Sequence, residues 1–96
     1  MGKLNKTGAV EYRCAYRYMT GEIEGFVGIS LSGEAEARQD ALNQIGRKLV
    51  HVNHARKYKG LSEEFFEPGR LITSIKGLTT AEKAMIEADW KTGLRY

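Results

Sequence analysis

The stretch from Val10 to Leu31, VEYRCAYRYMTGEIEGFVGISL, decides the fold of this chain. Apolar and polar residues alternate on both sides of Thr20-Gly21, a pattern that is typical of a β-hairpin. If Thr20-Gly21 is a two-residue loop, Tyr18 faces Ile23 across the two strands. This register places four cross-strand pairs on one face of the hairpin, which are Tyr18–Ile23, Cys14–Val27, Tyr12–Ile29 and Val10–Leu31.

The length and composition indicate one small globular domain. The 96 residues are expected to form a single domain, residues 1–96, with a loose lead-in over residues 1–8. Hydrophobic residues make up 42% of the chain, which is enough for one modest core. Cys14 is the only cysteine, so an internal disulfide is excluded and a buried, reduced thiol is predicted.

The chain also lacks the usual signs of a membrane or secreted protein. No apolar run approaches the roughly 20 residues of a membrane span. The first residues do not contain the apolar core of a signal peptide. We therefore expect a cytoplasmic protein without a membrane partner.

A first helix is predicted directly after the hairpin. Ser32 is a good N-cap for a helix that begins near Gly33. Apolar residues at i+4 spacing form its predicted buried stripe, which is Ala37, Ala41, Ile45 and Leu49. From Leu49 to Lys59 the pattern allows either an extended segment or continued helix, and we favour helix to about Ala55.

The last third of the chain predicts a connection, a strand and a second helix. Residues 61–69 are expected to connect the elements with one short helical turn capped by Ser62, before a third strand over residues 70–76. Thr79-Thr80-Ala81-Glu82 has the spacing of a capping box, which predicts a helix from Thr80 to about Thr92. The predicted buried stripe of this helix is Ala81, Ala84, Met85 and Ala88, with Trp90 beside it.

The predicted order of elements is β-β-α-β-α, which defines an α+β fold. The simplest architecture has two layers, an antiparallel sheet of about three strands with the helices on one face. The predicted core consists of Val10, Tyr12, Cys14, Tyr18, Ile23, Val27, Ile29, Leu31, Ala41, Ile45, Leu49, Ile75 and Met85.

The sequence contains few signs of catalysis. No strained nucleophile turn and no glycine-rich phosphate loop is present. His51 and His54 lie three residues apart and would share a helix face, but a zinc site needs about four ligands. The acids Glu63, Glu64 and Glu67 are more typical of a solvated loop than of an acid–base pair. We therefore expect no enzymatic activity, no cofactor and no metal, and a small metal-dependent enzyme is a distant third hypothesis.

Charge segregation is the most informative surface feature. The chain has a net charge of +3, yet residues 47–59 contain five basic residues and no acid. A basic run with an interleaved aromatic ring suits phosphate contacts and base stacking, although a solvated helix end would also look like this. The candidate binding residues are Arg47, Lys48, His54, Arg56, Lys57, Tyr58 and Lys59, with Arg13 and Arg17 added from the outer face of the hairpin.

The hairpin followed by Ser32-Gly33-Glu34-Ala35-Glu36-Ala37 resembles the β-β-α end of a double-stranded-RNA-binding domain. It is also similar to the small domain by which tyrosine integrases grip arm-type DNA sites. The first family presents lysines at the start of its last helix, whereas this chain has Glu34 and Glu36, which repel phosphate there. In the second resemblance Arg13 and Arg17 would face the groove, but they share their hairpin face with acids.

In size and style the whole chain resembles small phage-encoded inhibitors, including anti-CRISPR proteins. That resemblance implies a non-enzymatic protein that inhibits or modulates a host nucleic-acid-handling complex through a charged surface. In this hypothesis the basic residues meet an acidic patch, and the acids of residues 61–67 imitate phosphate in a basic channel. The alternative is a nucleic-acid-binding module that uses residues 47–59 directly. Expected partners are thus a protein or nucleoprotein complex or nucleic acid, and an uncovered sheet face would favour a homodimer through the hairpin edge.

Overall fold

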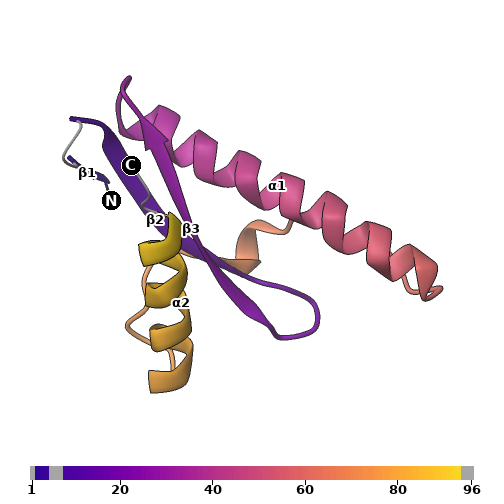
Figure 1. The fold of residues 1–96 in the computed structure, drawn as a ribbon. Coiled ribbons are helices and arrows are strands. Elements are labelled where there is room, and N and C mark those ends of the chain that lie inside the picture. The colour runs from indigo at the N-terminus through magenta and orange to yellow at the C-terminus, as the bar shows by residue number, and fades with distance from the viewer. Residues whose placement is uncertain (1, 5–7, 94–96) are drawn as a thin grey trace.

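The computed structural model describes residues 2–4 and 8–93 of the chain. In chain order its elements are β1 (Gly2–Leu4), β2 (Val10–Arg17), β3 (Ile23–Ser30), α1 (Glu34–Tyr58), the 3₁₀ turn η1 (Pro68–Arg70), β4 (Leu71–Ile72) and α2 (Thr80–Gly93) (Figure 1). The α+β class and the antiparallel sheet are confirmed. In the described residues no helix has the length and apolar character needed to span a membrane.

The sheet is built around β2. Strand β3 pairs with β2 along its whole length, whereas β1 and β4 share the opposite edge. Residues 2–4 pair with residues 10–12, and residues 71–72 pair with residues 15–16. The predicted loose lead-in therefore contains a short strand, and the strand predicted over residues 70–76 is reduced to Leu71–Ile72.

The register of the hairpin differs from the predicted one by one residue. Cys14 lies opposite Phe26 instead of Val27, and Arg17 lies opposite Ile23. The loop contains three residues, because the Gly21 N–H donates to the Tyr18 carbonyl at 2.9 Å and the Tyr18 N–H donates to the Glu22 carbonyl at 2.8 Å. Gly21 adopts a φ of 92°, the left-handed conformation that closes a three-residue hairpin loop.

With this register the apolar residues of β3 lie on both faces of the sheet, Phe26 on one and Ile23 on the other. Phe26 joins Tyr12, Cys14, Tyr16 and Tyr18 against α1. Ile23 and Ala15 pack on the other face with Ile86 of α2. A one-residue slip reverses every side chain of a strand, so each face of the sheet needs its own cover. The helices accordingly lie on opposite faces, which corrects the prediction that both cover one face.

Two glycines of β3 show how closely the helices approach. A Cβ atom on Gly28 would overlap the backbone of Ala37 and Ala41 in α1. A Cβ atom on Gly25 would lie 2.8 Å from the Ile86 carbonyl of α2. Each glycine therefore allows one helix to pack directly on the strand.

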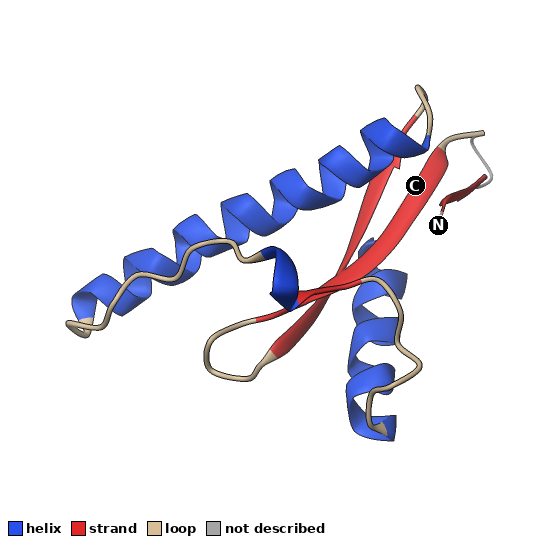
Figure 2. Ribbon diagram, turned by 180° about the vertical axis from the view of Figure 1, so that it is seen from behind, coloured by secondary structure: helices blue, strands red, loops and turns tan. Residues whose placement is uncertain are grey.

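The buried stripe of α1 is confirmed as Ala37, Ala41, Ile45 and Leu49. The small residues of this stripe come first and the large ones follow. The distance between α1 and the sheet therefore increases along the helix, as the diverging ribbons in Figure 1 show. The helix continues to Tyr58, three residues beyond the predicted end, and its distal half projects past the hairpin (Figure 2). Its N-cap is Gly33, which has no capping side chain, instead of Ser32.

Most of the predicted core is confirmed, with two clear exceptions. Leu31 is 82% exposed, and Met85 is also exposed. Ile86 occupies the buried face of α2 and Trp90 packs beside it, so the predicted alanine stripe of this helix faces solvent. The predicted capping box is confirmed, since Thr79 and Glu82 exchange two hydrogen bonds of 3.1 Å between side chains and backbone N–H groups.

The segment after α1 runs back along the helix in extended form, which corrects the helical turn predicted after Ser62. We call residues 61–67 the return segment. Asn53 holds its middle through two hydrogen bonds, donating to the Glu64 carbonyl at 2.8 Å and accepting from the Glu64 N–H at 2.7 Å. Tyr16 holds its end, because the Tyr16 hydroxyl accepts a hydrogen bond from the Glu67 N–H at 2.9 Å.

Candidate functional site: the outer face of α1

One side of the projecting half of α1 carries exposed basic, aromatic and apolar residues. Positions 47, 51, 54 and 58 recur at intervals of four, three and four residues and therefore lie on one side of a helix. This side points away from Ile45 and Leu49 in the core. We define the outer face of α1 as the exposed residues Arg47, Val50, His51, His54, Lys57 and Tyr58.

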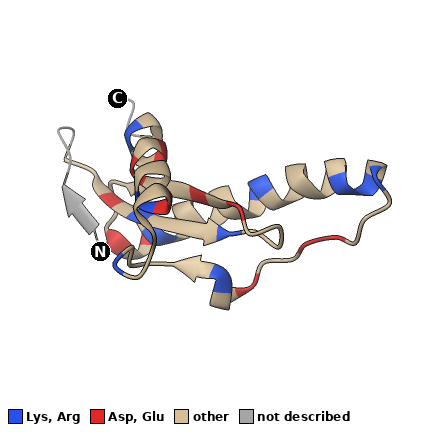
Figure 3. Ribbon diagram, turned by 90° about the horizontal axis from the view of Figure 1, so that it is seen from below, with Lys and Arg blue, Asp and Glu red and all other residues tan. Residues whose placement is uncertain are grey.

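The basic residues predicted to form one surface are separated by the helix. Lys48 points toward the sheet, and its Nζ lies 3.7 Å from a carboxylate oxygen of Glu24. The Arg56 Nε donates to the Ser62 carbonyl at 2.6 Å and so helps to attach the return segment. Arg47, His54, Lys57 and Tyr58 remain together on the outer face, and Lys59 is exposed directly after it. Figure 3 shows the blue bands of this stretch running to the far end of α1.

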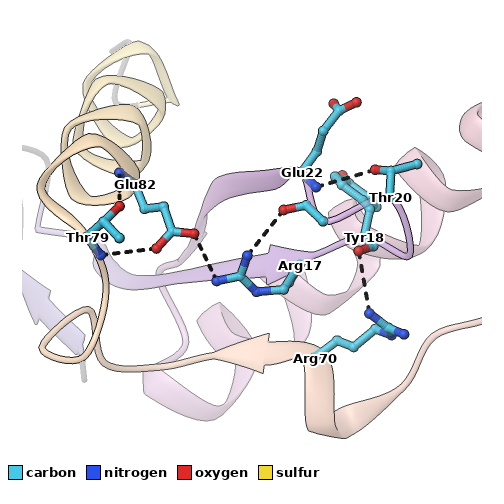
Figure 4. Close-up of polar contacts among 8 residues, drawn as sticks. Arg17, Tyr18, Thr20, Glu22, Arg70, Thr79 and Glu82 are labelled. Atoms are coloured by element: carbon cyan, nitrogen blue, oxygen red, sulfur yellow. Dashed lines mark hydrogen bonds and ion pairs between the residues drawn. The ribbon is translucent and has the colours of Figure 1, made fainter.

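Arg13 and Arg17 are not brought to this surface. Both lie on the sheet face that α2 covers. Arg17 donates to a Glu82 carboxylate oxygen at 3.1 Å and to the Gly21 carbonyl at 3.2 Å, which joins the hairpin loop to α2 (Figure 4). Arg13 pairs with Glu11 at 3.3 Å and lies 5.8 Å from the centre of the Trp90 ring. These contacts support the packing of α2 on the sheet.

Two hollows open on the outer face. The smaller one, of about 310 Å³, is lined by His54, Lys57 and Tyr58. The larger one, of about 550 Å³, continues along the helix and is lined by Arg47, Val50, His51, Asn53, His54, Lys57 and Glu63. The His54 and Tyr58 rings meet edge to face, with centroids 5.5 Å apart and planes at 77°. The face is therefore a shaped surface with a ring and basic groups around it.

Val50 and His51 belong to this face, although neither was among the predicted binding residues. The signal that identifies them is helical periodicity carried through from Arg47 to Tyr58. That periodicity can be recognised only when residues 49–58 are known to be helical.

A third hollow, of about 460 Å³, lies where the edge of β3 meets both helices. Its walls contain Arg47 and His51, so it joins the outer face from the side. The strand edge beneath it is covered by helix side chains. Asp89 accepts the Gly25 N–H and Asp40 accepts the Ile29 N–H, both at 2.9 Å, while Gln44 donates to the Val27 carbonyl. These three backbone groups of the β3 edge are therefore already paired within the protein.

The sequence predicts that the acids of the return segment form one solvated group. The structure corrects this prediction, because one of the three is buried. Glu64 is only 2% exposed, and its Oε2 accepts the Met19 N–H at 2.9 Å. Its Oε1 is buried without a hydrogen-bond partner among the described residues. Glu63 and Glu67 are exposed, and Glu67 pairs with Arg70 at 3.1 Å. Glu64 therefore attaches the return segment to the hairpin loop and cannot face a partner.

Among the residues that the structure describes, three side chains have shifted pKa values, and all three lie outside the outer face. Burial raises the pKa of the Cys14 thiol to about 11, so the thiol stays protonated and unreactive at neutral pH. Burial, followed by a hydrogen bond to Glu24, raises the pKa of Tyr18 above its ordinary value. The Thr79 N–H, followed by the Arg17 guanidinium, lowers the pKa of the Glu82 carboxyl. Each shift reflects how the fold is held together.

In the part of the chain that the structure describes, no three histidine, cysteine or acidic side chains gather as a metal site requires. His51 and His54 share the outer face, as their spacing predicts, but neither brings a third ligand with it.

Comparison of the chain with protein-family models, with curated proteins and with solved structures finds no match. What can be said of its function comes from its own residues and their geometry.

Proposed function

We propose that this protein is a non-enzymatic binding domain and that the outer face of α1 contacts an anionic surface of a macromolecular partner. The observation that carries the proposal is the exposure of Arg47, Lys57 and two imidazoles on one side of a helix that projects from the body of the protein. No acid occurs in residues 47–59, so this part of the helix does not neutralise its own charge.

The fold supports this proposal because it leaves two basic side chains of the outer face exposed. Lys48 and Arg56 have partners within the protein, whereas Arg47 and Lys57 line the hollows of an exposed surface. Exposed Lys and Arg side chains gain interaction energy when they meet phosphates or carboxylates on another molecule, and this gain is weakened by salt. A rigid helix also presents such groups with a fixed spacing.

The partner that fits best is a complex that handles nucleic acid, because such complexes present phosphates or acidic surfaces. A domain of this size that occupies such a surface blocks or modulates the complex without any chemistry of its own. This agrees with the resemblance to small phage-encoded inhibitors. Direct binding of nucleic acid is the alternative, and it uses the same outer face.

Retention on immobilised heparin, a sulfated polyanion, tests the proposed face for either partner. Arg47→Glu combined with Lys57→Glu should elute at much lower salt than the wild type. The matched control is Lys76→Glu combined with Lys91→Glu, which changes the net charge equally at exposed positions outside α1. Equal loss of retention in both double variants would show that net charge alone governs binding and would contradict the proposal.

A further inference from the structure

We infer that Tyr58, His54 and Lys57 form a stacking platform for an unpaired nucleobase, so that the ligand class of the outer face is single-stranded nucleic acid. This inference rests on the proposed function, because it assigns a ligand to the same face. It adds a role for the aromatic ring, which the attraction between charges alone does not require.

The first argument is the exposure of the Tyr58 ring. Tyr58 is 85% exposed, the largest exposed fraction among the large hydrophobic residues of the described chain. Covering an aromatic ring with another flat ring removes its apolar faces from water. His54 braces the ring edge to face, and a single contact of this kind leaves at least one face of Tyr58 open.

The second argument is the arrangement of charge around the ring. Lys57 lines the hollow beside Tyr58, and Arg47 lines the hollow that continues along the helix. Ten residues separate them, or about 15 Å of helix axis at 1.5 Å per residue. A stacked strand rises about 3.4 Å per nucleotide along its axis, so roughly four nucleotides would span this distance. A base on Tyr58 thus leaves its backbone beside basic groups.

The same features favour a single strand over a duplex or an acidic protein. In a duplex the bases stack on one another, so no base face is available to Tyr58. Carboxylates of a protein would pair with Arg47 and Lys57 but would leave the ring unused. Glu63 also lines the larger hollow, where its carboxylate repels phosphate but can accept hydrogen bonds from N–H groups of bases.

Fluorescence anisotropy with a labelled oligothymidine of about twelve nucleotides tests the platform. Tyr58→Ala should weaken binding about tenfold or more, the usual effect of removing one stacked ring, while Tyr58→Phe should bind like the wild type. Phe65→Leu is the matched control, because Phe65 is an exposed ring that lines neither hollow. Tyr58→Trp should bind, and its added fluorescence should be quenched by the oligonucleotide.

The inference is overturned if Tyr58→Ala binds oligothymidine as the wild type does, or if no binding occurs at low salt. It is also overturned if a duplex or polyglutamate binds as tightly as the single strand and Tyr58→Ala leaves the binding of both unchanged. Heparin retention that still depends on Arg47 and Lys57 would then leave the proposed function standing with a protein or duplex partner. Heparin retention that does not depend on Arg47 and Lys57 would contradict both the proposed function and this inference.

Discussion

The two halves of α1 share one continuous helix but have different surroundings. In the proximal half, residues 34–46, Ala37, Ala41 and Ile45 pack against the sheet. In the distal half, residues 47–58, Leu49 is the buried residue, and most other side chains are exposed. Packing therefore determines the residues of the proximal half, whereas those of the outer face are free to suit a partner.

The strongest test of this difference is Gly28→Ala, where β3 lies directly against the backbone of the proximal half. The added Cβ would overlap the backbone of Ala37 and Ala41, which cannot yield as a flexible side chain does. We expect a loss of about 3 kcal/mol or more in the free energy of unfolding, at the upper end of overpacking effects. Urea denaturation followed by circular dichroism measures it. A variant as stable as the wild type would show that α1 does not rest on β3 as described.

Asn53→Ala tests how the distal half is attached. Asn53 makes both hydrogen bonds to the backbone of Glu64, and its loss leaves two partly buried backbone groups without this partner. We expect a loss of about 1–3 kcal/mol, with faster amide hydrogen exchange at Glu64. The control is Asn43→Ala, because Asn43 is exposed and bonds only to Gln39 among the contacts of its side chain in the described chain. Similar losses in the two variants would mean that the return segment is not held by Asn53.

Much of the fold follows from local patterns in the sequence. The hairpin, both helices and the capping box at Thr79 depend on neighbours a few residues apart, and all of them are predicted. The hairpin register is not, because a three-residue loop closed by Gly21 and a two-residue loop at Thr20-Gly21 fit the same residues. That one-residue difference also places the helices on opposite faces, so a local ambiguity becomes an error in architecture.

The candidate site is predicted only in part, because local patterns reveal its charge and do not reveal which residues remain exposed. The basic stretch is visible in the sequence, but which of its residues stay free depends on contacts between distant segments. Lys48 meets Glu24 and Arg56 meets Ser62 only after the chain has folded. The burial of Glu64 depends on Met19, 45 residues away, which no local pattern reveals.

Gly46→Ala sharpens the comparison from the opposite direction. Gly46 lies in the middle of α1 at the boundary of the two halves, and a Cβ there would meet no described atom within 4 Å beyond its chain neighbours and the adjacent helix backbone. Alanine is favoured over glycine in a helix, so we expect a gain of about 0.5–1 kcal/mol. Urea denaturation should show a higher midpoint with an unchanged slope. A loss of stability would indicate that the exposed side of α1 is more crowded than the structure shows.

The smallest expected effect compares the two helix starts. The N-cap of α1 is Gly33, which has no capping side chain, whereas Glu82 caps α2 and also binds Arg17. These contacts lower the pKa of Glu82 in the folded state, so its carboxylate stabilises the fold above the unfolded pKa of about 4.3. That contribution is lost as the pH falls through the lower, folded pKa.

Glu82→Gln should therefore be less stable than the wild type at neutral pH, and the difference should narrow as the solution is acidified below pH 4. Urea midpoints measured at both pH values give the comparison. Glu87→Gln removes the same charge from an exposed position of α2 and should show little difference at either pH. If the Glu82 variant kept the full acid response of the wild type, the capping box and the Arg17 pair would have no part in the pH dependence of folding. The first turn of α2 would then gain no stability from its capping side chain, like the first turn of α1, which has none.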